Sequence, residues 1–168
     1  NFVKTEAKAR YFMPIFPDAG LVGSVKGQAG IINTFGSSGL NPVEAFNYGN
    51  TLVRGFQPSN MGPRIGAQPV GYTAYAGGSL EATFPIPMLP ETYGLSGSVW
   101  ADAAVVGGQG ASGAVDPTSI NQPLKSSVGA SIIWDSPFGP LRGDFAYVLT
   151  KATDDKTQMF ALTLQTLL

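Results

Sequence analysis

Apolar and polar residues alternate with a period of two along most of the chain. Between Val3 and Met13 the odd positions are apolar or small, except for Thr5, and the even positions include four charged residues, Lys4, Glu6, Lys8 and Arg10. Residues that alternate in this way point to opposite faces of a β-strand. The pattern predicts a strand with one apolar face and one strongly charged face.

Six further segments show the same alternation, at residues 21–35, 72–86, 93–106, 127–135, 141–150 and 160–168. Several of the seven segments are longer than the five or six residues usual for a strand of a globular protein. Short turns such as FPDAG and SPFGP alternate with longer loops at about residues 36–71 and 107–126. The sequence therefore predicts an all-β, antiparallel protein with seven long strands.

Long alternating strands with short turns at one end and long loops at the other are typical of a transmembrane β-barrel. Aromatic residues near the predicted strand ends fit an interfacial girdle; they are Tyr11, Phe12, Phe35, Tyr72, Phe84 and Tyr93. The alternative is a soluble β-sandwich with one solvated face, although its strands tend to be shorter.

The amino-acid composition excludes several classes of function but adds little about the fold. The chain has 168 residues with 10 basic and 11 acidic side chains, which leaves no electrostatic footprint for nucleic acid. It has no cysteine and no histidine, so thiolate chemistry and the commonest general base and metal ligand are missing. We expect no enzyme, no cofactor and no metal site. The adjacent carboxylates Asp154 and Asp155 are expected to be solvated in a polar turn.

The segment TLVRGF, residues 51–56, places an arginine inside a loop rich in Gly, Pro and Asn. It resembles the VRGF/Y motif of the Omp85 superfamily, which lies in the long sixth extracellular loop of those barrels. Three later segments resemble the strands that follow the motif, with the same order and spacing. They are GGSLEATFPIP (77–87), GSVWADAAVV (97–106) and SSVGASIIWDSPFGPLRGDFAYVLTK (126–151). Within the superfamily, the Ser-Pro-x-Gly-Pro-Leu turn favours the assembly factors over TamA-like or two-partner secretion transporters.

The resemblance implies that residues 1–168 are the C-terminal portion of a larger, sixteen-stranded barrel, without its N-terminal strands and periplasmic POTRA domains. Seven strands alone would expose unpaired backbone to lipid at both sheet edges. The implied function is the insertion and folding of β-barrel proteins into the outer membrane of a Gram-negative bacterium. The implied partners are outer-membrane lipids, nascent β-barrel clients and the accessory lipoproteins of the assembly complex.

The resemblance also implies a role for the motif, Val53, Arg54, Gly55 and Phe56, which we call the latch segment. In the superfamily the long loop folds back into the lumen, and its arginine meets acidic groups on the barrel wall. Here the matching acids are Glu81 and Asp102, both on the polar face of predicted neighbouring strands. A rigid guanidinium fork suits paired carboxylates. An ordinary solvated arginine is the alternative.

We expect Gly55 to permit a close backbone approach or a positive φ, and Phe56 to pack against the wall or the loop. Arg142 and Asp144 are expected to line the lumen, and the sequence alone does not assign partners to them. The last predicted strand would form one side of the barrel seam, through Phe160, Leu162, Leu164 and Leu168. The terminal Leu168 and Ala104 depart from the family pattern, which has an aromatic residue and a glycine there. A stand-alone porin or adhesin barrel and a soluble sugar- or lipid-binding β-sandwich stay open as alternatives.

Overall fold

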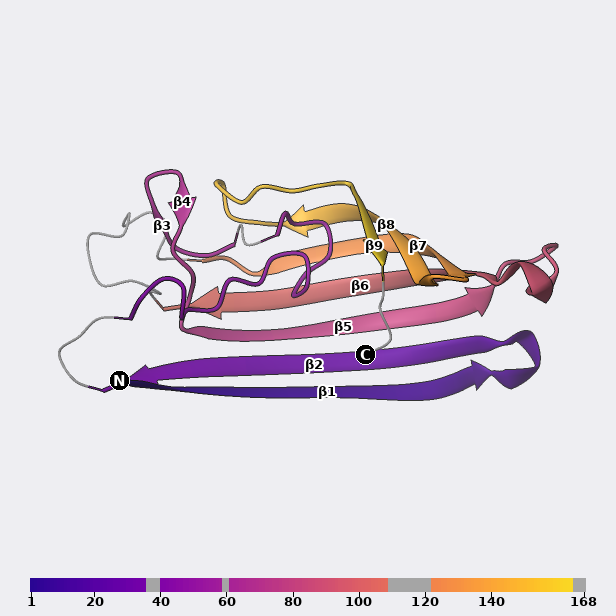
Figure 1. Cartoon of the computed structure of the whole chain (residues 1–168), viewed down its shortest axis with the longest axis horizontal. Coiled ribbons are helices and arrows are strands. Elements are labelled where there is room, and N and C mark those ends of the chain that lie inside the picture. Colours follow the sequence, from indigo (N-terminus) through magenta and orange to yellow (C-terminus); the bar gives the residue numbers. More distant parts are fainter. Residues whose placement is uncertain (36–39, 59–60, 109–121, 165–168) are drawn as a thin grey trace.

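The structure is a computed structural model that describes residues 1–35, 40–58, 61–108 and 122–164. Seven long strands form one antiparallel sheet in the order β1-β2-β5-β6-β7-β8-β9 (Figure 1). They are β1 (Phe2–Phe16), β2 (Leu21–Thr34), β5 (Ala74–Pro85), β6 (Leu95–Gly107), β7 (Lys125–Ser136), β8 (Gly139–Thr150) and β9 (Phe160–Leu164). The predicted all-β, antiparallel architecture is confirmed.

The connections contain short elements that the alternation did not predict. A small hairpin lies between β2 and β5 and consists of β3 (Arg64–Ile65) and β4 (Gln68–Pro69). The turns after β1 and β5 contain single turns of 3-10 helix, η1 (Pro17–Ala19) and η2 (Glu91–Tyr93). No helix in the described ranges is long and apolar enough to cross a membrane.

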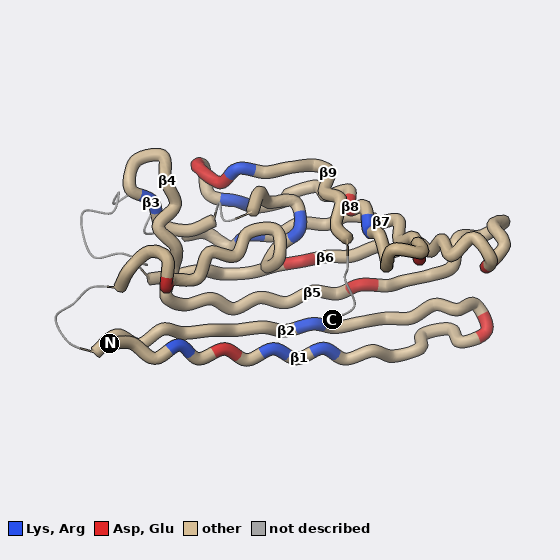
Figure 2. The backbone as a smooth tube through the Cα atoms, viewed as in Figure 1, with Lys and Arg blue, Asp and Glu red and all other residues tan. Residues whose placement is uncertain are grey.

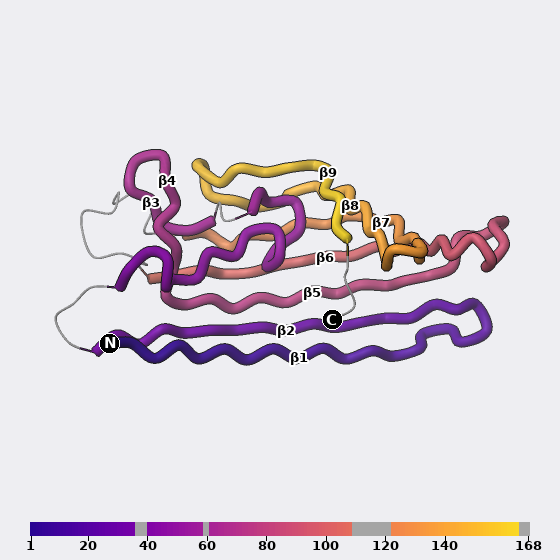
Figure 3. Tube along the Cα trace, viewed as in Figure 1, coloured from indigo at the N-terminus to yellow at the C-terminus, as the bar shows by residue number. Residues whose placement is uncertain are grey.

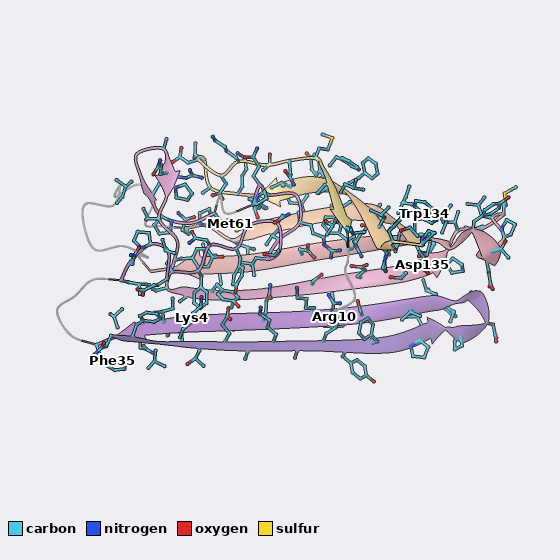
Figure 4. All side chains as sticks on the ribbon, viewed as in Figure 1. Lys4, Arg10, Phe35, Met61, Trp134 and Asp135 are labelled. Carbon is cyan, nitrogen blue, oxygen red and sulfur yellow. The ribbon has the colours of Figure 1, made fainter. Side chains whose placement is uncertain are left out.

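The sheet has two chemically different faces, as the alternation predicted. Lys4 and Arg10 point from β1 toward the side on which the long loop lies, and we call this side the inner face (Figure 4). Charged positions follow one another along β1 in Figure 2. The opposite, outer face exposes large apolar side chains, among them Val25, Leu80, Val99, Val128, Ile132, Phe145, Tyr147 and Leu162. A continuous apolar surface of this kind is what lipid contact requires.

The sheet curves around its inner face. One cavity of about 400 Å³ is lined by residues from all seven long strands, from Arg10 of β1 to Thr163 of β9, and by the loop between β2 and β5. In the part of the chain that is described, β1 pairs only with β2 and β9 only with β8, so both are sheet edges.

The hydrophobic core lies between this loop and the inner face. We call the buried residues there the loop cluster; they include Phe46, Leu52, Val53, Phe56, Met61, Tyr72, Tyr75, Ala104 and Val106. Met61 marks the position of the loop in Figure 4. Burial of several large side chains against the wall supplies the main drive for the loop to fold inward, since a fully buried large apolar side chain contributes about 1.5–3 kcal/mol.

Tyr72 departs from its predicted position at the girdle on the outer face. It is fully buried, and its hydroxyl donates to the carbonyl of Tyr48 at 2.9 Å and accepts from the N–H of Tyr48 at 3.1 Å. Its backbone pairs with Phe46 of the loop, and β5 begins two residues later, at Ala74. The prediction was wrong because the alternation was extended past the strand, into a segment whose direction the loop determines.

Candidate functional site

Arg54 lies on the inner face, where its guanidinium meets the carboxylates of two neighbouring strands. Nε and Nη2 donate to the two oxygens of Asp102 on β6, each at 2.7 Å, and Nη1 donates to Glu81 on β5 at 2.6 Å. The backbone N–H of Arg54 also donates to Asp102, at 3.0 Å. The structure thus brings together the three residues that the motif analysis matched, in the bidentate geometry that a planar guanidinium favours.

Two more side chains complete the surroundings of the guanidinium. Nη2 donates to Ser79 Oγ at 2.9 Å, and this hydroxyl donates to Asp102 at 2.6 Å across the β5–β6 ladder. The ring centroid of Trp100 lies 4.0 Å from Cζ of Arg54, which adds a cation–π contact. Sequence reasoning missed both contacts. The alternation carried a signal for them, because Trp100 has the same parity as Asp102, and Ser79 the same parity as Glu81.

The site is largely closed to solvent. The side chain of Asp102 is 3% exposed, and those of Glu81 and Arg54 are 14% and 17% exposed. Burial alone would lower the pKa of the Arg54 guanidinium, but the hydrogen bonds and charges of Asp102 and Glu81 outweigh it and hold the pKa above its usual value. The buried cluster of Arg54, Asp102 and Glu81 contains both signs of charge, and its members are hydrogen-bonded to one another. Loss of any one member would leave an uncompensated buried charge.

The neighbours of Arg54 fit the loop closely against the wall. Gly55 has a φ of 96°, and a Cβ on it would lie 2.9 Å from Cβ of Ala146 and 3.1 Å from Cγ2 of Val148 on β8. Glycine alone satisfies both the positive φ and the close approach. Val53 and Phe56 are fully buried in the loop cluster. The latch segment therefore combines an ion-pair anchor with two apolar anchors, while its role as a latch stays a prediction.

Arg142 of β8 extends the charged site and was underestimated from the sequence. Its Nη1 and Nη2 donate to the two oxygens of Glu81 at 2.7 and 3.2 Å, and its Nε donates to Asp144 at 2.7 Å. Glu81 therefore accepts hydrogen bonds from two arginines, one on the loop and one on the wall. Alternation gave the correct face for Arg142, but it contains no information on contacts across three strands.

A comparison with protein families covers the residues of this site. A family model described as the Omp85 superfamily domain matches residues 1–166. The chain belongs to the Omp85 superfamily. The match covers the latch segment, both carboxylates and all seven long strands, so the resemblance seen in the motifs is confirmed.

Two curated relatives of this Omp85 chain carry the name outer membrane protein assembly factor BamA. The protein of Neorickettsia risticii (strain Illinois) is 31% identical over 164 residues, which cover 94% of this chain and 21% of the relative. The protein of Neisseria meningitidis serogroup B (strain ATCC BAA-335 / MC58) is 29% identical over 166 residues, with coverage of 83% and 21%. The Omp85 chain thus spans about a fifth of the length of the curated relatives it matches.

A solved structure agrees with the fold. The crystal structure of BamA from Haemophilus ducreyi lacking POTRA domains 1–3 superposes with a TM-score of 0.81 at 21% identity. The match covers 96% of this chain and 34% of that one. The Omp85 chain therefore has the fold of part of an antiparallel transmembrane β-barrel.

A second cluster attaches the first half of the loop to β1. The hydroxyls of Tyr48 and Tyr75 donate to Oε1 of Glu6, at 2.7 and 3.1 Å. Nζ of Lys4 lies 4.4 Å from the ring centroid of Phe46. Burial, followed by the hydrogen bond to Glu6, raises the pKa of Tyr48 to about 12. Sequence reasoning placed the charges of β1 on one face of the strand and did not identify these tyrosine partners.

Asp155 differs from its predicted solvated state, whereas Asp154 is exposed. The Asp155 side chain is 1% exposed and forms an ion pair with Lys125, whose side chain is fully buried at the start of β7. The prediction was wrong because a TDDK turn reads as polar surface unless the packing of the loop over it is known.

The described residues of the predicted seam lie at the edge of the sheet. Phe160, Leu162 and Leu164 belong to β9 and are exposed, and Phe160 contacts Phe145 of β8 with ring centroids 5.0 Å apart. Leu168 lies outside the described residues.

Ala104, which replaces the family glycine, is buried opposite Gly77 on β5. The partner glycine provides the space that the extra methyl group needs.

Proposed function

We propose that this chain is the C-terminal portion of the barrel of an outer-membrane assembly factor, which inserts and folds β-barrel proteins into the outer membrane of a Gram-negative bacterium. Superfamily membership and the names of two relatives support the proposal. The observation that carries it is the site of Arg54, Glu81 and Asp102, which holds a long loop across the inner face. No bond is made or broken in this function, so no catalytic residue is proposed.

The proposed mechanism uses the edge strand β9. The five residues of β9 that are described pair with β8 from Leu141 to Phe145, and no described strand pairs with the other side of β9. An edge strand presents backbone N–H and C=O groups on its unpaired side. An opened edge can accept the strand of a client through backbone hydrogen bonds, which is recognition by β-strand addition.

The outer and inner faces have separate tasks in this proposal. The apolar outer face contacts outer-membrane lipids, and the edge at β9 contacts nascent β-barrel clients. The latch segment keeps the long loop on the inner wall while the edge opens. The BAM-complex lipoproteins are the expected accessory partners of the full-length protein. The N-terminal strands, which complete a sixteen-stranded barrel, and the periplasmic POTRA domains belong to that longer protein.

A complementation experiment with the full-length protein tests the proposal. Arg54→Ala is introduced in cells depleted of the native protein, with Asp154→Asn as a control, because Asp154 is exposed and is not among the residues that bind the Arg54 guanidinium. We expect less folded porin in the outer membrane with Arg54→Ala than with the control. Normal porin levels combined with a secretion defect would favour a transporter of the same superfamily. Normal porin levels and normal secretion would refute the proposed role of the latch.

The mass of the native protein separates a long assembly factor from a stand-alone barrel. An antibody against the loop between β2 and β5 is used to probe outer membranes after denaturing electrophoresis. A band several times heavier than 17.5 kDa is expected. A band at 17.5 kDa would favour a small porin or adhesin, in which several copies would have to close one barrel.

A further inference from the structure

The latch segment pairs with a second part of the chain, just before β9. Phe56 forms an antiparallel bridge with Thr157. The N–H of Gln57 donates to the carbonyl of Lys156 at 2.9 Å, and the N–H of Gln158 donates to the carbonyl of Gly55 at 2.8 Å. Figure 3 shows the long chain segment between β8 and β9 that contains these residues. Backbone pairing of this kind fixes a register between two loops that have no strand of their own here.

The buried pair Lys125–Asp155 holds this second segment against the wall. The Asp155 carboxylate accepts from Lys125 Nζ and from the N–H of Ala152, the latter at 3.0 Å. Lys125 Nζ also donates to Gln122 Oε1 at 2.9 Å, and Lys151 Nζ donates to the carbonyl of Asp155 at 3.0 Å. The Lys125–Asp155 pair thus attaches the turn to the start of β7, and each of the two residues makes a further hydrogen bond to its own surroundings.

The same segment leads directly into the edge strand. Gln158 is two residues before the first residue of β9, and the carbonyl of Met159 accepts from the N–H of Ala146 on β8 at 2.8 Å. Ala146 also limits the space beside Gly55, as its Cβ would lie 2.9 Å from a Cβ at that position. The loop, the wall at β8 and the entry to β9 therefore meet within a few residues.

We propose that Lys125 and Asp155 are positioning residues that hold residues 156–158 as a second docking site for the long loop, and that the docked loop thereby sets where β9 begins. A single hydrogen-bonded bridge between two loops is weak in isolation, because both segments lose backbone freedom when they pair. The buried ion pair provides the fixed partner, since its carboxylate and ammonium are held to each other and to the neighbouring backbone. An effect of the docked loop on client insertion at β9 rests on the proposed function, whereas the docking of the loop does not.

Backbone hydrogen exchange in the full-length protein in detergent micelles tests the inference without any assembly assay. The reporters are the amides of Gln57 and Gln158, which donate across the bridge, and the amide of Ala146, which donates at the entry to β9. Asp155→Asn leaves the Lys125 charge buried without its partner. We expect it to accelerate exchange at the three reporters at least about tenfold, with unchanged exchange in β5 and β6. The matched control is Asp154→Asn, which removes an exposed carboxylate of the same turn.

Equal exchange at the reporters in Asp155→Asn and Asp154→Asn would overturn the inference. If Asp155→Asn does not yield a folded barrel, the unmodified protein decides. Its Gln57 and Gln158 amides must then be protected well above the exposed Asp154 amide, and free exchange at both would overturn the inference. Loss of porin assembly with unchanged reporter exchange would contradict the docking site but leave the proposed function standing. Faster reporter exchange with normal porin assembly would support the docking site and show that client insertion does not depend on it.

Discussion

Removal of the Arg54 guanidinium should weaken loop docking more than any other single change at the inner face. Arg54→Ala leaves Asp102, whose side chain is 3% exposed, without its bidentate partner and Glu81 with Arg142 alone. Loss of one partner from a buried ion pair costs about 3–5 kcal/mol, because the remaining charge is uncompensated. At about 1.4 kcal/mol per factor of ten, this corresponds to a shift in the docking equilibrium of roughly two to three and a half powers of ten. Arg54→Lys should retain part of the stability, since one ammonium cannot replace a fork that reaches two carboxylates.

A double-mutant cycle with Asp102→Asn measures this contribution. The free energy of unfolding is determined in detergent micelles for the native protein, for each single variant and for the double variant. We expect the double variant to be less destabilised than the sum of the two single variants, with a coupling of about 1–3 kcal/mol, since both changes remove the same interaction. Additive effects would show that the two groups do not depend on each other. An Arg54→Lys variant as stable as the native protein would refute the importance of the fork geometry.

Three further predictions concern neighbours of the site. Gly55→Ala should destabilise the barrel by about 1–3 kcal/mol more than Gly66→Ala in the same unfolding assay. Both glycines have positive φ, but of the two only Gly55 lacks space for a Cβ. Equal losses of stability would contradict the close approach at Gly55. Arg142→Ala should cost less than Arg54→Ala, because the bidentate pair of Arg54 with Asp102 remains intact; an equal or larger loss would reverse this ranking. The pKa of Tyr48 is raised to about 12, so its contribution to stability should be constant below about pH 10 and be lost as the pH rises to about 12. Tyr48→Phe should reduce the loss of stability over this pH range, as followed by alkaline unfolding, and an unchanged profile would contradict the prediction.

The strands were predictable from the sequence because a period of two assigns each residue to a face without knowledge of its partners. This is why Glu81 and Asp102 could be placed on the inner face, and why the seven segments were found with bounds that differ by only a few residues. The motif then identified Arg54 as the residue that reaches them. Both inferences depend on local sequence. One rests on periodicity, and the other rests on a short segment, residues 51–56, that resembles a motif of a known family.

Contacts made by loops were not predictable in the same way. The loop between β2 and β5 has no periodicity, so nothing in the sequence indicated that Tyr48 would reach Glu6 or that Tyr72 would turn inward. Asp155 was misjudged for a related reason, since the burial of a polar turn depends on which other segment covers it. Such contacts join residues far apart in the chain, and their energy comes from packing that exists only after the sheet has formed.

The loop is held at three places that differ in strength. The bonds of Tyr48 and Tyr75 to Glu6 involve an exposed strand residue, and exposed polar interactions contribute little because water competes for the same groups. The Arg54 site on β5 and β6 and the Lys125–Asp155 pair beside the backbone bridge lie farther along the sheet from β1, and the side chains of both ion pairs are largely buried. We therefore expect the loop to detach first from β1 and to stay attached near β9. An assembly factor that opens at its last strand would in this way retain the loop contacts closest to the opening, so that loop and edge strand move as one unit.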